Sequence, residues 1–132
     1  MGKRFPKEDE ELFEKSQRYK RNGDYEKALL CMNNFLVKHP DIFLPYMMLG
    51  SIYWKMNKLD EAISQFKKGI EKNQNHEKLS LCLFHTLWDK GLRFEALEEM
   101  KRFLTNNKSD EYTEILNGIT VKLHEKPINT DL

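Results

Sequence analysis

The chain has 132 residues, 39% of them hydrophobic and 33% charged, a composition that suits one domain with a thin core and a large solvated surface. Its 22 basic residues nearly balance its 21 acidic ones, so the net charge of +1 provides no general attraction toward nucleic acid or anionic membranes. No apolar run approaches the roughly 18 residues of a membrane span, and no apolar stretch follows the charged N-terminus as in a secretory signal. We therefore expect a cytoplasmic protein whose two cysteines, Cys31 and Cys82, stay reduced.

A period of 34 residues organises the chain. Alanine recurs at this spacing, as Ala28, Ala62 and Ala96, and large apolar side chains stand four and eight positions after each alanine. This spacing places the apolar residues on one face of a helix. Glycine or asparagine, which tolerate positive φ and end helices, stands five positions before each alanine. The pattern predicts an all-α fold with helices, in chain order, near residues 8–21, 25–38, 43–56, 59–72, 77–90, 93–105 and 110–124.

These columns resemble the tetratricopeptide repeat, a helix–turn–helix unit. The second unit, residues 43–76, has the residue types of the family pattern at Tyr46, Leu49, Gly50, Tyr53, Asn57, Ala62 and Phe66. The first unit, residues 9–42, departs at Lys15, where leucine is usual, and the third, residues 77–110, has Phe84 where the family has a small residue. The resemblance implies three repeats stacked as a short right-handed superhelix, because no single helix pair can bury its apolar face alone.

Residues 111–124 are predicted to form a capping helix that covers the last repeat. Ser109 is a suitable N-cap with acidic residues after it, and apolar residues from Tyr112 to Leu123 follow at helical spacing. Pro127 then prevents the helix from continuing, so residues 125–132 are expected to fray.

In proteins of this repeat family, the first helix of each repeat lines a concave groove. The register carried over from the family assigns to that groove Phe13, Gln17, Lys20, Met47, Met48, Ser51, Trp54, Lys55, Leu81, His85 and Trp88. The two tryptophans share one repeat position, and with the methionines they form an apolar strip of the kind that marks recognition sites. The resemblance implies a non-enzymatic module that binds a protein or peptide segment there. Alternatively, the strip is internal core, is covered by the N-terminal segment, or joins two copies of the chain as a homodimer.

Several functions fit such a strip. An adaptor, an immunity protein or inhibitor that sequesters a toxin or effector, and a secretion-type chaperone all remain open. Single-stranded nucleic-acid binding through the tryptophans and lysines is a further alternative, although Glu10, Glu14 and Asp89 in the same groove argue against it. The clamp that grips acidic tails of heat-shock chaperones is not expected, because only one of its five positions has the required residue type. Those positions are Phe13, Gln17, Met48, Lys78 and Cys82, of which Lys78 fits.

The sequence contains no motif of known catalytic chemistry. No Gly-rich phosphate loop, zinc-binding pattern or nucleophile elbow occurs, and the four histidines are not at ligand spacing. Cys82 and His85 stand three apart on one predicted helix, but no third group accompanies them. We therefore expect no enzymatic activity, no cofactor, no metal and no small-molecule substrate.

Overall fold

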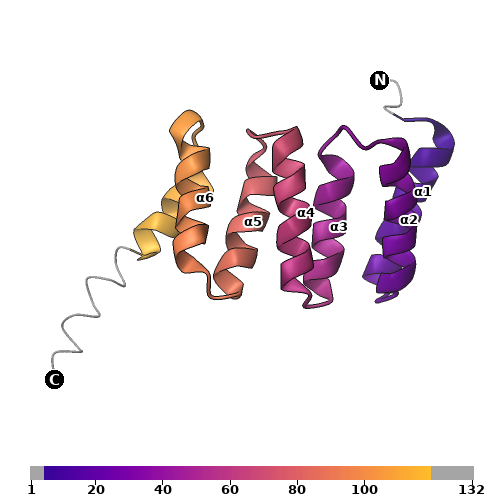
Figure 1. The fold of residues 1–132 in the computed structure, drawn as a ribbon, viewed down its shortest axis with the longest axis horizontal. Coiled ribbons are helices and arrows are strands. Elements are labelled where there is room, and N and C mark those ends of the chain that lie inside the picture. The colour runs from indigo at the N-terminus through magenta and orange to yellow at the C-terminus, as the bar shows by residue number, and fades with distance from the viewer. Residues whose placement is uncertain (1–4, 120–132) are drawn as a thin grey trace, which may run out of the picture.

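The computed structural model describes residues 5–119, which form a row of helices packed side by side (Figure 1). The helices are α1 (Lys7–Arg21), α2 (Tyr25–Lys38), α3 (Leu44–Lys55), α4 (Leu59–Lys72), α5 (Glu77–Asp89) and α6 (Arg93–Asn106). Residues 110–119 are also helical. No strand occurs within residues 5–119, so the predicted all-α architecture of stacked helix pairs with a final capping helix is confirmed.

The bounds of these six helices agree with the predicted ones to within one residue at each end. The predicted end of the capping helix at residue 124, and the fraying predicted for residues 125–132, lie outside the described residues. The division into repeats at residues 9–42, 43–76 and 77–110 stays a prediction.

Local sequence signals explain where these helices begin. Three acidic residues occupy the first turn of α1 and three basic residues its last turn, which complements the helix dipole. Pro45 lies in the first turn of α3, where its missing N–H costs no hydrogen bond. The His76 imidazole caps α5 by accepting a hydrogen bond from the Leu79 amide (3.2 Å).

The turn inside each helix pair has the same backbone geometry. Gly23, Asn57 and Gly91 adopt φ values of +84°, +59° and +90°, which L side chains other than asparagine rarely tolerate. In each pair the next residue donates its amide hydrogen to a carbonyl five positions earlier; Asp24, for example, donates to Tyr19 over 2.8 Å. This bond closes the helix end in the manner of a Schellman motif. The recurring glycine-or-asparagine column therefore has a structural cause.

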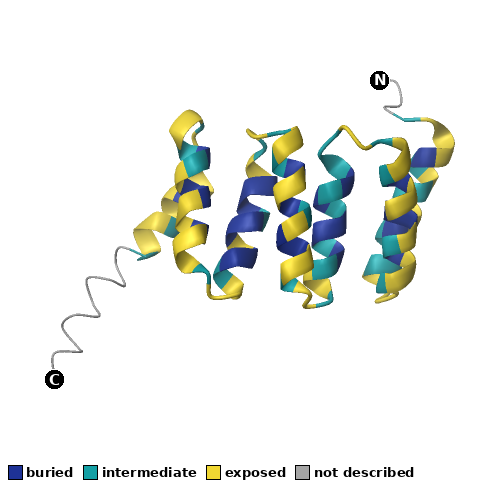
Figure 2. Ribbon diagram, viewed as in Figure 1, coloured by how far each residue is buried: buried dark blue, intermediate teal, exposed yellow. Residues whose placement is uncertain are grey.

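The core lies between the helices, and the outward faces are exposed (Figure 2). The three recurring alanines are completely buried, which lets neighbouring helices approach. The two helices also approach closely at Gly50 of α3, where an added Cβ would lie 2.5 Å from the Phe66 ring of α4. The absence of a side chain at Gly50 thus makes room for the Phe66 ring between α3 and α4.

One end of the row is closed by a buried acidic side chain of α1. Asp9 is only 4% exposed, and its carboxylate accepts hydrogen bonds from Lys38 Nζ (2.9 Å) and His39 Nε2 (2.8 Å) at the end of α2. These hydrogen bonds lower the pKa of Asp9. The Phe5 ring lies edge-on to Phe35 (5.2 Å between centroids) and to His39 (4.8 Å), so Phe5 packs against the end of α2.

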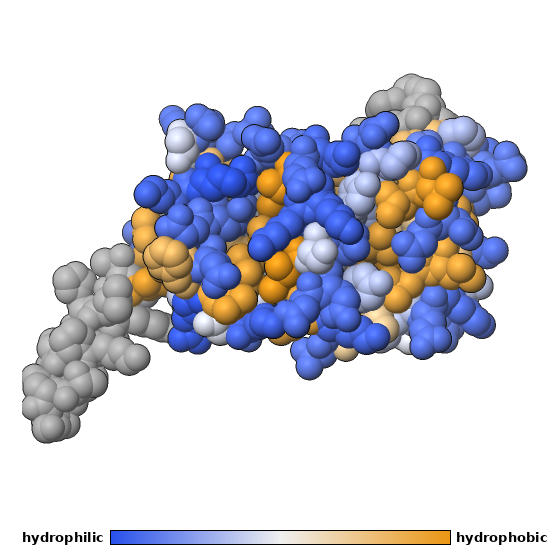
Figure 3. Space-filling view, viewed as in Figure 1, coloured by the Kyte–Doolittle hydropathy of each residue, from blue (hydrophilic) through white to orange (hydrophobic). Residues whose placement is uncertain are grey.

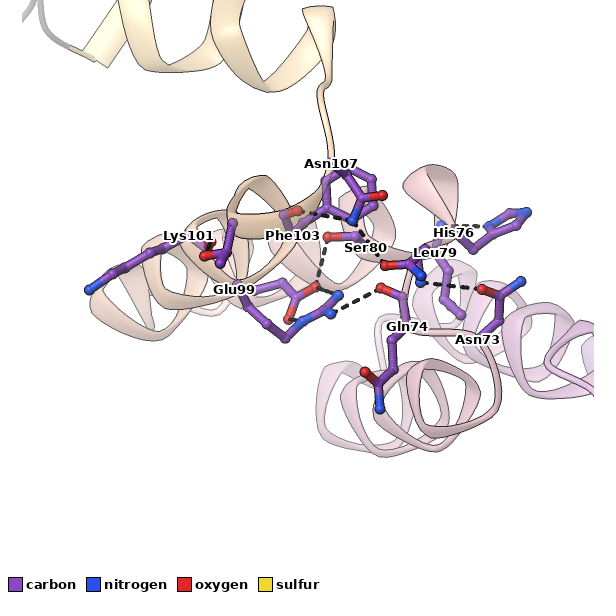
Figure 4. Close-up of polar contacts among 12 residues, drawn as sticks. Asn73, Gln74, His76, Leu79, Ser80, Glu99, Lys101, Phe103 and Asn107 are labelled. Carbon is purple, nitrogen blue, oxygen red and sulfur yellow. Dashed lines mark hydrogen bonds and ion pairs between the residues drawn. The ribbon is translucent and has the colours of Figure 1, made fainter.

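The other end is closed by a polar network around Ser80, which is fully buried. Ser80 Oγ donates to Glu99 Oε2 (2.7 Å), so its contact with the Tyr112 hydroxyl (2.8 Å) is a hydrogen bond donated by Tyr112. Arg102 forms an ion pair with Glu99 (2.7 Å) and donates to the Gln74 carbonyl (3.0 Å). Figure 4 shows Ser80, Glu99 and Gln74 converging from α5, α6 and the turn before α5. Burial raises the pKa of Tyr112, which keeps its hydroxyl protonated as a donor.

The outer face in Figure 3 is mostly hydrophilic, with apolar groups gathered in places, including over α2. Two apolar residues of α2 are exposed, Leu30 (63%) and Val37 (79%). None of the described helices has the length and apolar character needed to cross a membrane.

Candidate protein-binding groove

A groove of about 710 Å³ runs between α3, α5 and the start of the helical residues 110–119. Its lining residues are Ser51, Trp54, Phe66, Glu77, Lys78, Leu81, Cys82, His85, Thr86, Asp89 and Glu111. Four of the predicted groove residues are among them, contributed by the first helices of the second and third predicted repeats. Phe66 and Leu81 are buried and provide an apolar floor.

Trp54 forms one wall of this groove and is the large aromatic residue most available to a partner there. Its side chain is 43% exposed. The indole Nε1 lies 3.4 Å from Asp89 Oδ2, a long hydrogen bond between α3 and α5. Lys55 Nζ lies 5.8 Å from the indole centroid. Trp54 is thus held in place by polar neighbours while its ring remains accessible.

The other tryptophan is packed differently, although it occupies the same repeat position. Trp88 is half-buried, and its ring stacks on Phe84 at 5.6 Å between centroids with an interplanar angle of 23°. The Arg93 guanidinium lies 4.9 Å from the Trp88 centroid. Phe84 in turn lies edge-on to Tyr112 (5.5 Å). The bulky residue at position 84 therefore packs toward Trp88 and the last helical segment.

The remaining predicted residues lie at several depths. Met47 is 6% exposed and belongs to the core beneath the groove, whereas His85 is exposed and Met48 half-buried. The ring centroid of Phe13 lies 5.9 Å from that of Phe35. Phe13 also lines a separate hollow of about 270 Å³ with Phe5, Glu10, Glu14 and Leu44. Gln17 has a buried Oε1 atom with no hydrogen-bond partner within residues 5–119. The assignment of the whole set to partner binding stays a prediction.

One lysine, Lys78, lines the groove together with the acidic residues Glu77, Asp89 and Glu111. Lys20, at the end of α1, is half-buried and donates from Nζ to Ser51 Oγ (2.5 Å). Burial lowers the pKa of Lys20, and the positive charges of Lys55 and Lys78 lower it further. Burial raises the pKa of the Cys82 thiol, and this effect is larger than the lowering by the positive charges of Lys78 and Lys20. The thiol is thus a poor nucleophile.

The repeat register also places Lys78, Cys82 and Asp89 in the groove, and all three line it. The register did not assign Phe66, Glu77, Thr86 or Glu111, which line the groove as well. Glu111 had no such signal, because it belongs to a helical segment outside the repeat pattern. In the described part of the chain, no cluster of three or more histidine, cysteine or acidic residues could hold a metal ion.

Comparison with known proteins supports the fold. A family model described as a tetratricopeptide repeat matches residues 45–76. The TPR domain of Sgt2 from Aspergillus fumigatus superposes with a TM-score of 0.76 at 15% identity, covering 96% of this chain and 86% of that one. The first TPR domain of Spaghetti (RPAP3), bound to an HSP90 peptide, gives a TM-score of 0.73 at 21% identity, covering 89% and 96%.

The translocator chaperone SycD of Yersinia enterocolitica type III secretion gives a TM-score of 0.72 at 17% identity, covering 99% of this chain and 100% of that one. No curated protein matches the sequence. Structural likeness at this level of identity establishes the fold. The resemblance seen in the sequence is therefore confirmed: residues 45–76 match the tetratricopeptide repeat, and the chain has the fold of the tetratricopeptide-repeat proteins.

Proposed function

We propose that this protein is a non-enzymatic interaction module that holds a segment of a partner protein in the groove between α3 and α5. The observation that carries the proposal is Trp54, a large aromatic side chain 43% exposed on the wall of a groove with an apolar floor. Aromatic anchors beside such floors supply most of the energy in protein recognition. The Spaghetti (RPAP3) domain, which has the same fold, is bound to a peptide.

The proposal is tested by replacing the proposed anchor. Trp54→Ala should weaken partner binding by about 2–4 kcal/mol, which corresponds to roughly 30-fold to 1,000-fold in Kd. Phe94→Ala is the matched control, because Phe94 is an aromatic residue of α6, 74% exposed, that does not line the groove. A partner captured from the native cell with the unaltered chain would be purified, and its affinity for each variant measured by calorimetry.

Two outcomes decide the matter. A loss confined to Trp54→Ala, with an unchanged melting temperature, supports binding in the groove. Equal affinities for the Trp54→Ala and Phe94→Ala variants would show that the partner binds elsewhere.

A secretion-type chaperone is the more specific version that one observation favours. SycD is matched over 99% of this chain and 100% of that chain, so the shared fold covers nearly the whole of both chains. A chaperone of this kind should keep an aggregation-prone apolar partner in solution at a one-to-one ratio. Light scattering of the purified partner, with and without the chain, measures this directly, and unchanged aggregation would exclude the chaperone version.

A further inference from the structure

The outer face of α6 has an exposed apolar stripe. Phe94, Leu97 and Leu104 follow one another at spacings of three and seven positions, which places them on one side of the helix. Phe94 is 74% exposed and Leu97 37%, and Leu116 of the helical residues 110–119 is 45% exposed. Figure 3 shows apolar groups at this end of the row. Beside the stripe is a hollow of about 440 Å³, lined by Leu97, Met100, Lys101, Leu104, Thr105 and Leu116.

The repeat pattern does not require this stripe to be apolar and open. Phe94 stands at the repeat position of Glu26 and Asp60, which are both acidic. Ile63, at the repeat position of Leu97, is only 9% exposed. The last helix pair therefore exposes apolar side chains at positions where the second pair has a charge or a covered side chain. An apolar patch of this kind marks an interaction surface.

Two opposite charges accompany the stripe. Glu98 and Lys101 are exposed and stand three positions apart on the outer face of α6. Within residues 5–119, neither of them forms an ion pair. When a surface binds its own copy across a two-fold axis, every contact occurs twice with the roles of the two copies exchanged. A face with one acidic and one basic residue can therefore pair both charges with a second copy of itself.

One antiparallel register satisfies the charges and the apolar side chains together. With the two-fold axis midway between Glu98 and Lys101, each Glu98 faces the Lys101 of the other copy. Positions equally far from the axis on either side face each other, so Phe94 then faces Thr105, at the edge of the hollow. The protruding aromatic ring of each copy thus meets the apolar hollow of the other.

We infer that two copies of this chain associate through the outer faces of their α6 helices in this antiparallel register. The partner is a second copy because the face is complementary to itself in charge and in shape. Phe94, Leu97, Glu98 and Lys101 do not line the groove between α3 and α5, so the dimer leaves both grooves open. The inference is therefore independent of the proposed function.

The test measures self-association of the full chain by sedimentation velocity. One helix face per copy makes a small interface, so monomers should convert to dimers with a Kd of about 10–100 µM at about 0.1 M salt. Glu98→Lys and Lys101→Glu should each weaken dimerisation at least about tenfold, because each variant turns two attractive contacts into two repulsive ones. An equimolar mixture of the two variants should dimerise as the unaltered chain does, since every introduced charge then faces its opposite.

Matched controls make the same changes elsewhere. Glu71→Lys and Lys68→Glu alter the charge equally at exposed positions of α4 and should leave the Kd unchanged. Phe94→Ala should weaken dimerisation at least about tenfold without lowering the melting temperature, because this side chain is 74% exposed. Leu30→Ala, at a position of α2 that is 63% exposed, is its control and should leave dimerisation unchanged.

Three results would overturn the inference. The first is a chain that stays monomeric at about 1 mM, or a mixture of the two charge variants that is no more dimeric than either alone. The second is a dimer that resists Phe94→Ala and is lost in Trp54→Ala, because the copies would then join through the groove. The third is hydroxyl-radical oxidation of Phe94 that is equally slow at about 10 µM and at about 1 mM, because another part of the same chain would then cover the stripe.

Discussion

The contact between Gly50 and Phe66 allows a quantitative test of the packing between α3 and α4. A Cβ added at Gly50 would lie 2.5, 2.6 and 2.9 Å from three carbon atoms of the Phe66 ring, about 1 Å inside the ordinary separation of carbon atoms. Phe66 is 2% exposed, so its ring cannot move into solvent. Overpacking of this kind costs about 1–3 kcal/mol.

A helical glycine replaced by alanine otherwise gains stability of up to about 1 kcal/mol. Gly118, in the helical residues 110–119, has no atom within 4 Å of an added Cβ. Gly118→Ala is therefore the control that reports propensity without crowding. We expect Gly50→Ala to be less stable than Gly118→Ala by about 1–3 kcal/mol, or roughly 4–10 °C in melting temperature for a chain of this size.

Urea unfolding of both variants, followed by circular dichroism, measures this difference. In a Phe66→Leu background the cost of Gly50→Ala should fall by at least about 1 kcal/mol, because the shorter side chain vacates the space. The reasoning is refuted if Gly50→Ala stabilises the chain as much as Gly118→Ala does.

Three further predictions concern single side chains. Asn57→Val should destabilise the chain by about 1–2 kcal/mol in urea unfolding, because Asn57 has φ +59° and a β-branched residue resists that conformation; Asn57→Gly should leave stability nearly unchanged. Asp9→Asn should lower the melting temperature at neutral pH. Since the pKa of Asp9 is lowered below 3.8 in the folded chain, its stabilisation is complete above pH 3.8 and is lost as the pH falls through the folded value, so the two melting curves should converge there. Tyr112→Phe should cost about 1–2 kcal/mol by removing the hydrogen bond to buried Ser80, and a loss below about 0.5 kcal/mol would contradict the donor role of Tyr112.

The helices and turns could be predicted because their causes are local. Gly23, Asn57 and Gly91 stand at one spacing in the sequence, and all three adopt positive φ. The apolar period similarly determines which face of each helix is buried. Neither signal needs knowledge of distant residues, so the helix bounds agree closely with the prediction.

The candidate site was less predictable, since exposure depends on packing between repeats. The register gives Trp54 and Trp88 one position, yet Trp88 stacks on Phe84, whereas Trp54 stands 43% exposed. Phe84 replaces the small residue of the family pattern and changes the surroundings of its own repeat. A position in the register therefore predicts the direction of a side chain, but not whether a neighbour covers it.

The polar network of Ser80, Glu99 and Tyr112 had no sequence signal. These residues are separated by 19 and 32 positions from Ser80, and no motif of fixed spacing links them. Only the packing of α5 on α6, and of the last helical segment on both, brings them together.

This network also bears on the order in which the chain acquires its structure during synthesis. A nascent chain that has emerged only as far as α6 has the hydrogen bond from Ser80 to Glu99 but lacks the one that Tyr112 donates to Ser80, and a hydrogen bond of this kind contributes about 0.5–1.5 kcal/mol. The third helix pair should therefore be less stable on the ribosome until Tyr112 arrives, while the first pair, held by Asp9 and its partners at the end of α2, can close early. The helices would then pack in order from the N-terminal end, and the helical residues 110–119 would pack last.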